Sequence, residues 1–363
     1  MNISTNDSEA RAEQAASKAQ FEAIYLGVDL HKAWIMVTRI IDGSGPQPAQ
    51  RFSWAGFLKF VAKQQVLARK VYVVYEAGAF GFWLCRQLRE QGVICQVCHP
   101  EKLDPHHKRV QTDKLDSAHL ADKLYRYAQG NPKAMRVVYV PSAAEEQRRI
   151  PARHRGFLKK QLLRLKARGR GLLLSQGIFE TGSWWQPEAW LELEGRLSAA
   201  LRAALTDLQA LIGQHEQELR QADKHLVKQA PKELPVGFGA LSYMLLKLQL
   251  CNYQRFKSRR AAAGFTGLCG GVSSSGPYHL DLSINKSGSP ELRALLVELA
   301  WRMIYYQPHY TGLKVWNRLG RGGSVRRRKI AVVATARQLM VDIWRWQTGQ
   351  VSPKQLGWRM SCA

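Results

Sequence analysis

The sequence predicts an α/β N-terminal domain followed by a mainly helical remainder, and three observations support this fold class. Short apolar runs rich in β-forming residues alternate with helix-like spacing up to about residue 97. Beyond Pro141, leucines recur at helical steps instead. Of the 363 residues, 45% are hydrophobic, which is enough for a core and argues against a disordered chain. No apolar run reaches the roughly 18–20 residues of a membrane span.

The N-terminal elements are expected in the order of three strands, a helix, a strand, a helix and a strand. In chain order they are Ile24–Asp29, Trp34–Ile41, Gln50–Trp54, the helix Phe57–Ala68, the strand Val71–Tyr75, the helix Phe82–Gln91 and the strand Val93–Val97. Asp42-Gly43 marks a turn, and Val71–Tyr75 has the continuous apolar character of a buried parallel strand. This order is that of a ribonuclease-H-like α/β fold, whose first three strands form a meander.

The remainder is expected to be mainly helical. Leucines from Leu193 to Leu219 repeat at steps of 3, 4 or 7, which fits a helical hairpin or coiled coil and equally an ordinary bundle helix. A Gly/Ser-rich segment then precedes a helix at Glu291–Tyr306. The predicted domains are a polar tail without signal-peptide character (1–22), the α/β domain (23–141), the central helices (142–230), a C-terminal domain (231–350) and a second tail (351–363).

Positive charge dominates the composition. Lys and Arg number 54 against 28 Asp and Glu, so the formal net charge is +26. Such a surplus predicts a polyanionic partner, because neutralising phosphates releases counterions. The clustered cations expected to contact nucleic acid are Arg148, Arg149, Arg153, Arg155, Lys159, Lys160, Arg164, Lys166, Arg255, Lys257, Arg259, Arg260, Lys286, Arg293, Arg326, Arg327, Arg328 and Lys329. The last four follow Gly320, Gly322 and Gly323, which predicts a flexible basic loop. Six Cys suggest a reducing cytosol and no disulfide framework.

Four carboxylates stand at positions that predict a metal site. Asp29 and Glu76 end two strands that would be parallel neighbours, so both belong at one edge of the sheet. Asp113 and Asp116 would share one face at the start of a helix capped by Thr112. Oxygen ligands suit Mg²⁺. Each acid alone is more simply a turn or helix-start residue, and only the conjunction favours catalysis.

A serine is the second candidate for chemistry. Ser273-Ser274-Ser275-Gly276-Pro277 follows a Gly-rich stretch and is by default a flexible linker. It lies between apolar helical segments, with Lys286 and Arg293 after it. A serine hydroxyl needs a base or a neighbouring charge to act as a nucleophile. All three serines remain candidates from the sequence alone.

These motifs resemble the transposases of insertion-sequence family one-ten, the RNA-guided bridge recombinases, from about Tyr25 to Gln347. Asp29 in Gly-Val-Asp, Glu76 in Glu-Ala-Gly, and Asp113 and Asp116 in Thr-Asp-Lys-Leu-Asp match the acids of the family's RuvC-like DEDD domain. Ser275-Gly276, after Gly267-Leu268, matches the position of its catalytic serine. This chain lacks the proline that many members carry before the serine loop, and it has Pro-Val-Gly-Phe-Gly where many have Pro-Gly-Ile-Gly.

The resemblance implies a DNA transposase that joins Ser275 covalently to a DNA end and is assisted by Mg²⁺ on the DEDD acids. It also implies a structured non-coding guide RNA, donor and target DNA, a homo-dimer or homo-tetramer, and a cytoplasmic, nucleoid-associated place in a bacterium. Two alternatives remain open. One is a metal-only nuclease, such as a RuvC-type junction resolvase. The other is a nucleic-acid-binding protein without activity.

Overall fold

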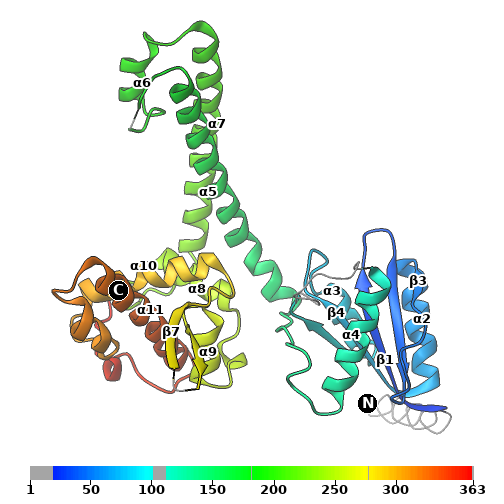
Figure 1. The fold of residues 1–363 in the computed structure, drawn as a ribbon. Helices are drawn as coiled ribbons and strands as arrows, with labels where there is room; N and C mark the ends of the chain where they lie inside the picture. Colours follow the sequence, from blue (N-terminus) through cyan, green and yellow to red (C-terminus); the bar gives the residue numbers. More distant parts are fainter. Residues whose placement is uncertain (1–18, 101–111, 181, 277, 362–363) are drawn as a thin grey trace, which may run out of the picture. The chain divides into compact units, whose positions relative to one another are not determined.

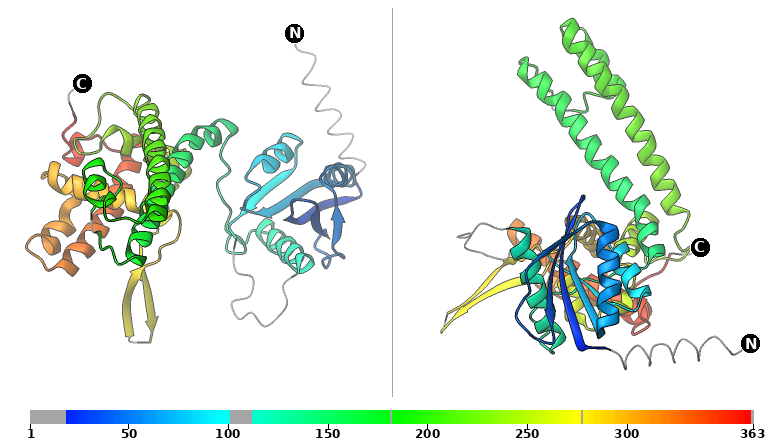
Figure 2. Two further views of the ribbon diagram at one scale, coloured as in Figure 1. Left: turned by 90° about the horizontal axis from the view of Figure 1, so that it is seen from above. Right: turned by 90° about the vertical axis from the view of Figure 1, so that its right-hand side faces the viewer.

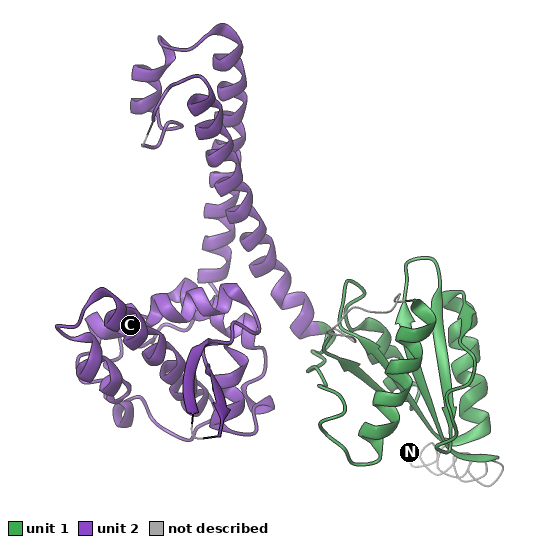
Figure 3. Ribbon diagram, in the orientation of Figure 1, with its two compact units in different colours: residues 1–143 green, residues 144–363 purple. Residues whose placement is uncertain are grey.

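The computed structural model describes residues 19–100, 112–180, 182–276 and 278–361. Most of the expected N-terminal tail therefore lies outside the described residues. The chain forms two compact units, Met1–Ala143 and Ala144–Ala363 (Figure 3). Within the described ranges, no helix combines the length and the apolar character needed to cross a membrane.

The first unit is built on a mixed five-stranded sheet with the order β3-β2-β1-β4-β5 (Figure 1). Its strands are β1 Phe21–Leu30, β2 Ile35–Ile41, β3 Gln50–Phe52, β4 Ala68–Glu76 and β5 Ile94–Cys98. The first three form an antiparallel meander, whereas β4 runs parallel to β1, and β5 runs parallel to β4. Helix α2 (Trp54–Leu67) leads from β3 to β4, and α3 (Trp83–Glu90) connects the parallel pair β4 and β5. The expected α/β architecture and element order are confirmed.

The two faces of this sheet carry separate cores, because side chains alternate along each strand. On one face, Ile24, Leu26 and Val28 pack with residues of α2 and α3. On the other face, Ala23 and Tyr25 pack with α4, the helix Asp113–Ala128. Both faces of β1 and β4 are therefore buried, as the apolar character of their sequences predicts.

The second unit begins with two long helices that lie side by side (Figure 2). They are α5 (Ala143–Ser175) and α7 (Ala199–Val227), joined through the short α6 (Pro187–Glu194). Leu162, Leu205 and Ile212 are buried in their shared core, together with Trp184. The helical character of this region is confirmed, and a coiled coil remains a prediction.

The C-terminal part of the second unit is mostly helical. Its elements are α8 (Ala240–Leu250), α9 (Arg259–Phe265), β6 (Gly270–Ser275), β7 (Tyr278–Ile284), α10 (Pro290–Tyr306) and α11 (Val325–Gln347). Apolar residues of α8, α10 and α11 form one core. The segment 351–361, expected to be a tail, packs on this core through buried Leu356 and Trp358.

Two local expectations in this part were wrong. The serine segment is not a flexible linker: β6 pairs with β7 in an antiparallel hairpin, so backbone hydrogen bonds fix its conformation. The basic run Arg326–Lys329 is not a loop either, because it forms the first turns of α11. Ser324 starts that helix by accepting a hydrogen bond from the backbone nitrogen of Arg327.

Candidate functional site

The strand register brings two of the predicted acids to neighbouring positions. Val28 of β1 pairs with Tyr75 of β4, so the residues that follow them, Asp29 and Glu76, lie side by side at the same end of parallel strands. Alternation places both on the face that packs against α4, since Tyr25 and Val74 have the same parity and are buried there. The register agrees with the expected position of both residues at one sheet edge, and a shared metal site that includes Glu76 remains a prediction.

Helix α4 brings the other two acids to this edge. Asp113 and Asp116 occupy its first turn, after the N-cap Thr112, whose side chain makes no capping hydrogen bond. The helix lies so close to β1 that a Cβ on Gly27 would stand 2.2 Å from the carbonyl oxygen of Ser117. A glycine is therefore required at position 27 for α4 to approach the sheet.

A buried hydrogen bond fixes α4 in place against the sheet. The hydroxyl groups of Thr38, on β2, and Ser117, on α4, lie 2.8 Å apart. Both residues are almost fully buried, so this bond is protected from competition with water. The bond and the close approach at Gly27 together set the height of the first turn of α4 above the strand ends.

His31 joins an acid of the strand to an acid of the helix. Its Nε2 lies 3.0 Å from Oδ2 of Asp29 and 3.3 Å from Oδ2 of Asp113. The ligand atoms of Asp29, His31 and Asp113 all lie within 4.8 Å of one another, which is the spacing of a potential metal site. These side chains are partly exposed, at 27%, 35% and 42%, so the cluster is accessible from solvent.

Asp116 lies in an environment that disfavours its charge. Burial is the main cause of its raised pKa, and the negative charges of Asp29 and Asp113 raise it further. Accumulated negative charge of this kind stabilises a bound cation. The carboxylate donors fit Mg²⁺, which takes oxygen ligands, and the imidazole nitrogen of His31 is a donor that other divalent ions also accept.

Sequence reasoning missed His31. It stands two residues after Asp29, just beyond the end of β1. That spacing was the available signal, because residues two apart at the end of a strand point to the same side. The backbone nitrogen of His31 donates to the carbonyl of Trp34, in a turn that brings the ring back toward Asp29.

Ser275 is the last residue of β6 and pairs with Tyr278 across the hairpin. Figure 2 shows this hairpin projecting from the helices of the C-terminal part. Ser273, Ser274 and Ser275 are all exposed. Among the described residues, no basic side chain hydrogen-bonds the Ser275 hydroxyl, so these residues provide no base that would activate it.

The predicted nucleic-acid-binding cations differ in their surroundings. Several are engaged within the protein: Arg155 pairs with Asp223, Lys166 with Glu216 at 2.7 Å, and Lys160 with Glu291 at 2.8 Å. Of the others, Arg149 is half-buried, and the exposed ones are Arg148, Arg153, Lys159, Arg164, Lys257, Arg259, Arg260, Lys286, Arg326, Arg327, Arg328 and Lys329.

Two further predicted cations have packing roles. The guanidinium group of Arg255 lies over the ring of Phe265, 4.4 Å from its centroid. Arg293 donates to the backbone carbonyls of Ser287 and Gly288, at the root of the serine hairpin. Both side chains therefore stabilise the base of the hairpin, whatever else they contact.

Comparison with known proteins defines the class. Residues 236–315, which include Ser275 and the hairpin, match the family model of the Transposase IS116/IS110/IS902 family. The chain also aligns over 91% of its length, at 28% identity, with y4rJ of Sinorhizobium fredii, which is named as a transposase, and the match covers 93% of that protein.

Two relatives from other bacteria have similar extents of alignment. The transposase for insertion sequence element IS1111A of Coxiella burnetii is 25% identical over 90% of both chains. The transposase for IS1533 of Leptospira borgpetersenii is 24% identical over 77% of this chain and 85% of its own. The protein is thus a transposase, an enzyme that acts on DNA. It belongs to the IS110/IS116/IS902 family.

Proposed function

We propose that this transposase cleaves and rejoins DNA through Ser275, assisted by a Mg²⁺ site on Asp29, Glu76, Asp113 and Asp116. The observation that carries the proposal is the cluster of Asp29, His31 and Asp113, which joins the end of β1 to the start of α4, in a chain whose matched family region contains an exposed serine. In this reading the first unit is a RuvC-like domain of the ribonuclease-H-like class. The two long helices are then the joint between subunits of a homo-dimer or homo-tetramer.

The serine step exchanges one phosphoester for another. The Oγ of Ser275 attacks the phosphorus of a DNA phosphodiester and loses its proton to a base or to water. The bond from phosphorus to the leaving strand's oxygen breaks, so that strand leaves with a hydroxyl group and the other end stays joined to the protein. Attack by a hydroxyl of a second strand reverses the exchange, restores the serine and joins the DNA.

The acid site supplies charge compensation for this exchange. A bound Mg²⁺ would stabilise negative charge on the attacked phosphate. Asp29 and Asp113 would hold it, and Glu76 and Asp116 would complete the oxygen donors. His31 would add a nitrogen donor beside them, because its Nε2 lies within 3.3 Å of the carboxylates of Asp29 and Asp113.

The decisive experiment is a set of serine variants. Purified wild type, incubated with DNA and Mg²⁺, is expected to give a DNA–protein product that survives SDS, and Ser275→Ala is expected to give none. Ser273→Ala and Ser274→Ala are matched controls on the same strand. An SDS-resistant product from Ser275→Ala would overturn the assignment of Ser275 as the nucleophile. If only Ser274→Ala loses the product, Ser274 is the nucleophile instead.

A second candidate is a metal-only nuclease. It is favoured by the observation that, among the described residues, no basic side chain hydrogen-bonds the Ser275 hydroxyl. Water would then attack the phosphodiester at the acid site, and the hairpin would serve only binding. Mg²⁺-dependent cleavage that survives Ser275→Ala, without any covalent product, is its signature. Asp29→Asn abolishes cleavage under either mechanism, whereas Asp122→Asn, on the outer part of α4, leaves it intact.

We further propose that a structured non-coding RNA selects the DNA sites by base pairing. The supporting feature is the number of exposed cations, which suit backbone contacts to two kinds of nucleic acid. Sequencing of the RNA that co-purifies with the protein tests this proposal. One enriched RNA species that restores site selection to RNase-treated protein is the expected result, and site selection by RNA-free protein would overturn it.

A further inference from the structure

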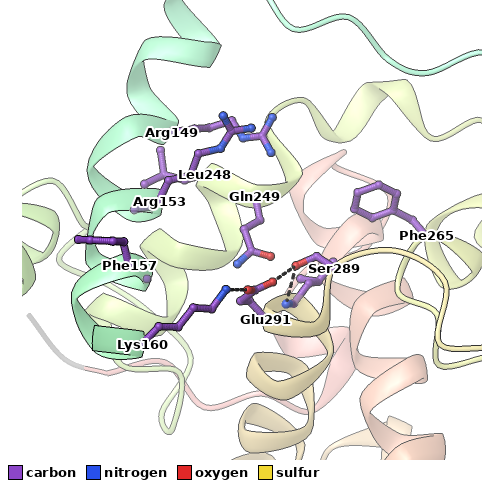
Figure 4. Close-up of a pocket in the computed structure, with 12 residues that line it drawn as sticks. Arg149, Arg153, Phe157, Lys160, Leu248, Gln249, Phe265, Ser289 and Glu291 are labelled. Atoms are coloured by element: carbon purple, nitrogen blue, oxygen red, sulfur yellow. Dashed lines mark hydrogen bonds and ion pairs between the residues drawn. The ribbon is translucent and has the colours of Figure 1, made fainter. Parts of the chain in front are cut away.

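A cavity of about 450 Å³ lies at the root of the serine hairpin. Its walls come from one face of α5, from the end of α8, from Phe265 just before the hairpin and from Ser289 just after it (Figure 4). The volume is within the usual range for sites that hold a small organic group. All of its walls belong to the second unit.

The face of α5 that lines the cavity combines positive charge with an aromatic ring. Arg149, Arg153, Phe157 and Lys160 recur at steps of three or four, so they form one row along the helix. Phe157 is 51% exposed although it is a large apolar side chain. Within the described residues, neither Arg149 nor Arg153 forms an ion pair. This row offers a stacking surface next to unneutralised cations.

The opposite wall carries a polar atom without a partner. The side-chain oxygen of Gln249 is buried and accepts no hydrogen bond from the described residues. Figure 4 shows Gln249 between the two arginines and the Ser289–Glu291 corner. A buried acceptor left unpaired is destabilising, so its retention favours a ligand that donates to it.

Glu291, the acid of this cavity, is already neutralised. Lys160 donates to its Oε1 at 2.8 Å, and Ser289 bonds its Oε2 at 3.0 Å. The pKa of Glu291 falls to about 2, mainly because of the hydrogen bond from Lys160. The cavity therefore presents net positive charge to a ligand, from Arg149 and Arg153.

We propose that this cavity holds a single unpaired nucleotide of the DNA strand that the protein processes. The base would stack on Phe157 and donate an N–H group to the Gln249 oxygen, while Arg149 and Arg153 contact its flanking phosphates. Each of these three contacts uses a feature that is otherwise unexplained in the protein. We assign the occupant as DNA because a transposase acts on DNA. The choice of DNA as the bound strand therefore rests on the proposed function.

The test is a binding measurement that involves no cleavage. Affinities are measured by fluorescence anisotropy for a labelled DNA duplex with one unpaired nucleotide and for the fully paired duplex of the same sequence. Stacking of one base on an aromatic side chain is expected to favour the first by about tenfold. A duplex with an abasic site in place of the unpaired nucleotide is expected to bind like the paired one.

A glycine pair provides matched variants. Gly156 lines the cavity, Gly171 lies further along α5, and a Cβ at either position meets nothing within 4 Å. Gly156→Leu fills the cavity without changing charge and is expected to remove the tenfold preference, whereas Gly171→Leu keeps it. Phe157→Leu and Gln249→Leu are each expected to reduce the preference for the unpaired nucleotide. Because the test uses several variants, a folding defect in one of them does not decide the result.

The proposal is overturned if wild type shows no preference for the unpaired nucleotide, or if Gly156→Leu retains that preference. A preference confined to the equivalent RNA duplex would also overturn it and assign the cavity to RNA. Because binding is measured without strand cleavage, the outcome is independent of whether Ser275 is the nucleophile. Failure of the serine mechanism and failure of the cavity proposal are therefore distinguishable.

Discussion

A methyl group on Gly27 would lie 2.2 Å from the backbone nitrogen of Ala121. This distance is far below van der Waals contact, so the helix that carries Asp113 and Asp116 can reach its position only above a glycine. The contact is between backbone atoms, which cannot rotate away. The spacing of the acid site thus depends on a residue that is not itself a ligand.

Gly27→Ala is therefore expected to push α4 away from β1. Overpacking of this kind costs about 1–3 kcal/mol of unfolding free energy. Displacement of Asp113 from Asp29 is expected to weaken Mn²⁺ binding, measured by calorimetry, even at temperatures where the variant is folded. Gly45→Ala is the matched control, because a Cβ at Gly45 meets nothing within 4 Å. Unchanged Mn²⁺ affinity in folded Gly27→Ala would contradict the role of this contact.

Asp116→Asn is expected to stabilise the metal-free protein at neutral pH. The pKa of Asp116 is raised in the folded state, so folding favours the protonated form, and this contribution is lost as pH rises through the folded pKa. A neutral isostere removes the remaining repulsion from Asp29, with a gain of under about 1 kcal/mol because water screens this partly exposed carboxylate.

Urea unfolding with and without Mg²⁺ measures this effect. Asp122→Asn, on the same helix, is expected to destabilise the protein slightly, because it breaks the exposed ion pair to Arg126 at 2.8 Å. Activity should be lost only in Asp116→Asn. A destabilised Asp116→Asn protein would show that this carboxylate has a structural role instead.

Reversal of Arg326, Arg327 and Arg328 to Glu is expected to weaken DNA binding and to flatten its salt dependence. Each lost phosphate contact reduces the slope of log K against log salt by about 0.9. These cations surround the positive end of α11, where no acid compensates them in the first turn, so an anionic partner is favoured there.

The control variant carries the same change in net charge at a different surface. Lys59, Lys63 and Lys70 are exposed residues of the first unit outside the predicted binding set, and their reversal should leave the slope nearly unchanged. Equal slopes for the two triple variants would show that binding follows net charge and not a specific surface.

Loss of Glu291 is expected to make stability less sensitive to acid. The folded pKa of Glu291 is about 2, below its ordinary value of 4.5, so the contribution of its ion pair is fully present above pH 4.5 and is lost as pH falls toward 2. Glu291→Gln should therefore be less stable than wild type at pH 6, by under about 1 kcal/mol because the pair is half exposed.

Guanidinium unfolding at pH 6 and pH 2 provides the measurement. The difference between wild type and Glu291→Gln should shrink at the lower pH. Glu298→Gln, on the same helix, controls for the general loss of one carboxylate. A difference that grows on acidification would contradict the Lys160–Glu291 pair as its source.

The sequence predicted the first unit well because its signals are local and strong. Apolar runs on β1 and β4 reflect burial on both faces, and the parallel pairing of these strands made the neighbouring backbone positions of Asp29 and Glu76 predictable. The position of α4 was harder to predict from the sequence, because it depends on the absence of a side chain at Gly27. His31 was missed because a histidine beyond a strand end has many ordinary explanations.

The serine hairpin was missed although a period of two is present. Tyr278, Leu280, Leu282 and Ile284 alternate with polar residues along β7, as in a strand. The serines and glycines of β6 have low strand propensity, and they concealed this signal. The cavity beside it could not be predicted, because its walls come from four segments that are separated along the chain.

The division of the acids between strands and helix has a consequence during synthesis of the chain. Asp29 and Glu76 emerge from the ribosome with the sheet, but Asp113 and Asp116 arrive only with α4, which ends at Ala128. A nascent chain shorter than this has half of the carboxylates and no helix over Gly27. The proposed cation site at this edge is therefore complete only after α4 has been translated, and the basic helix α5 emerges later still.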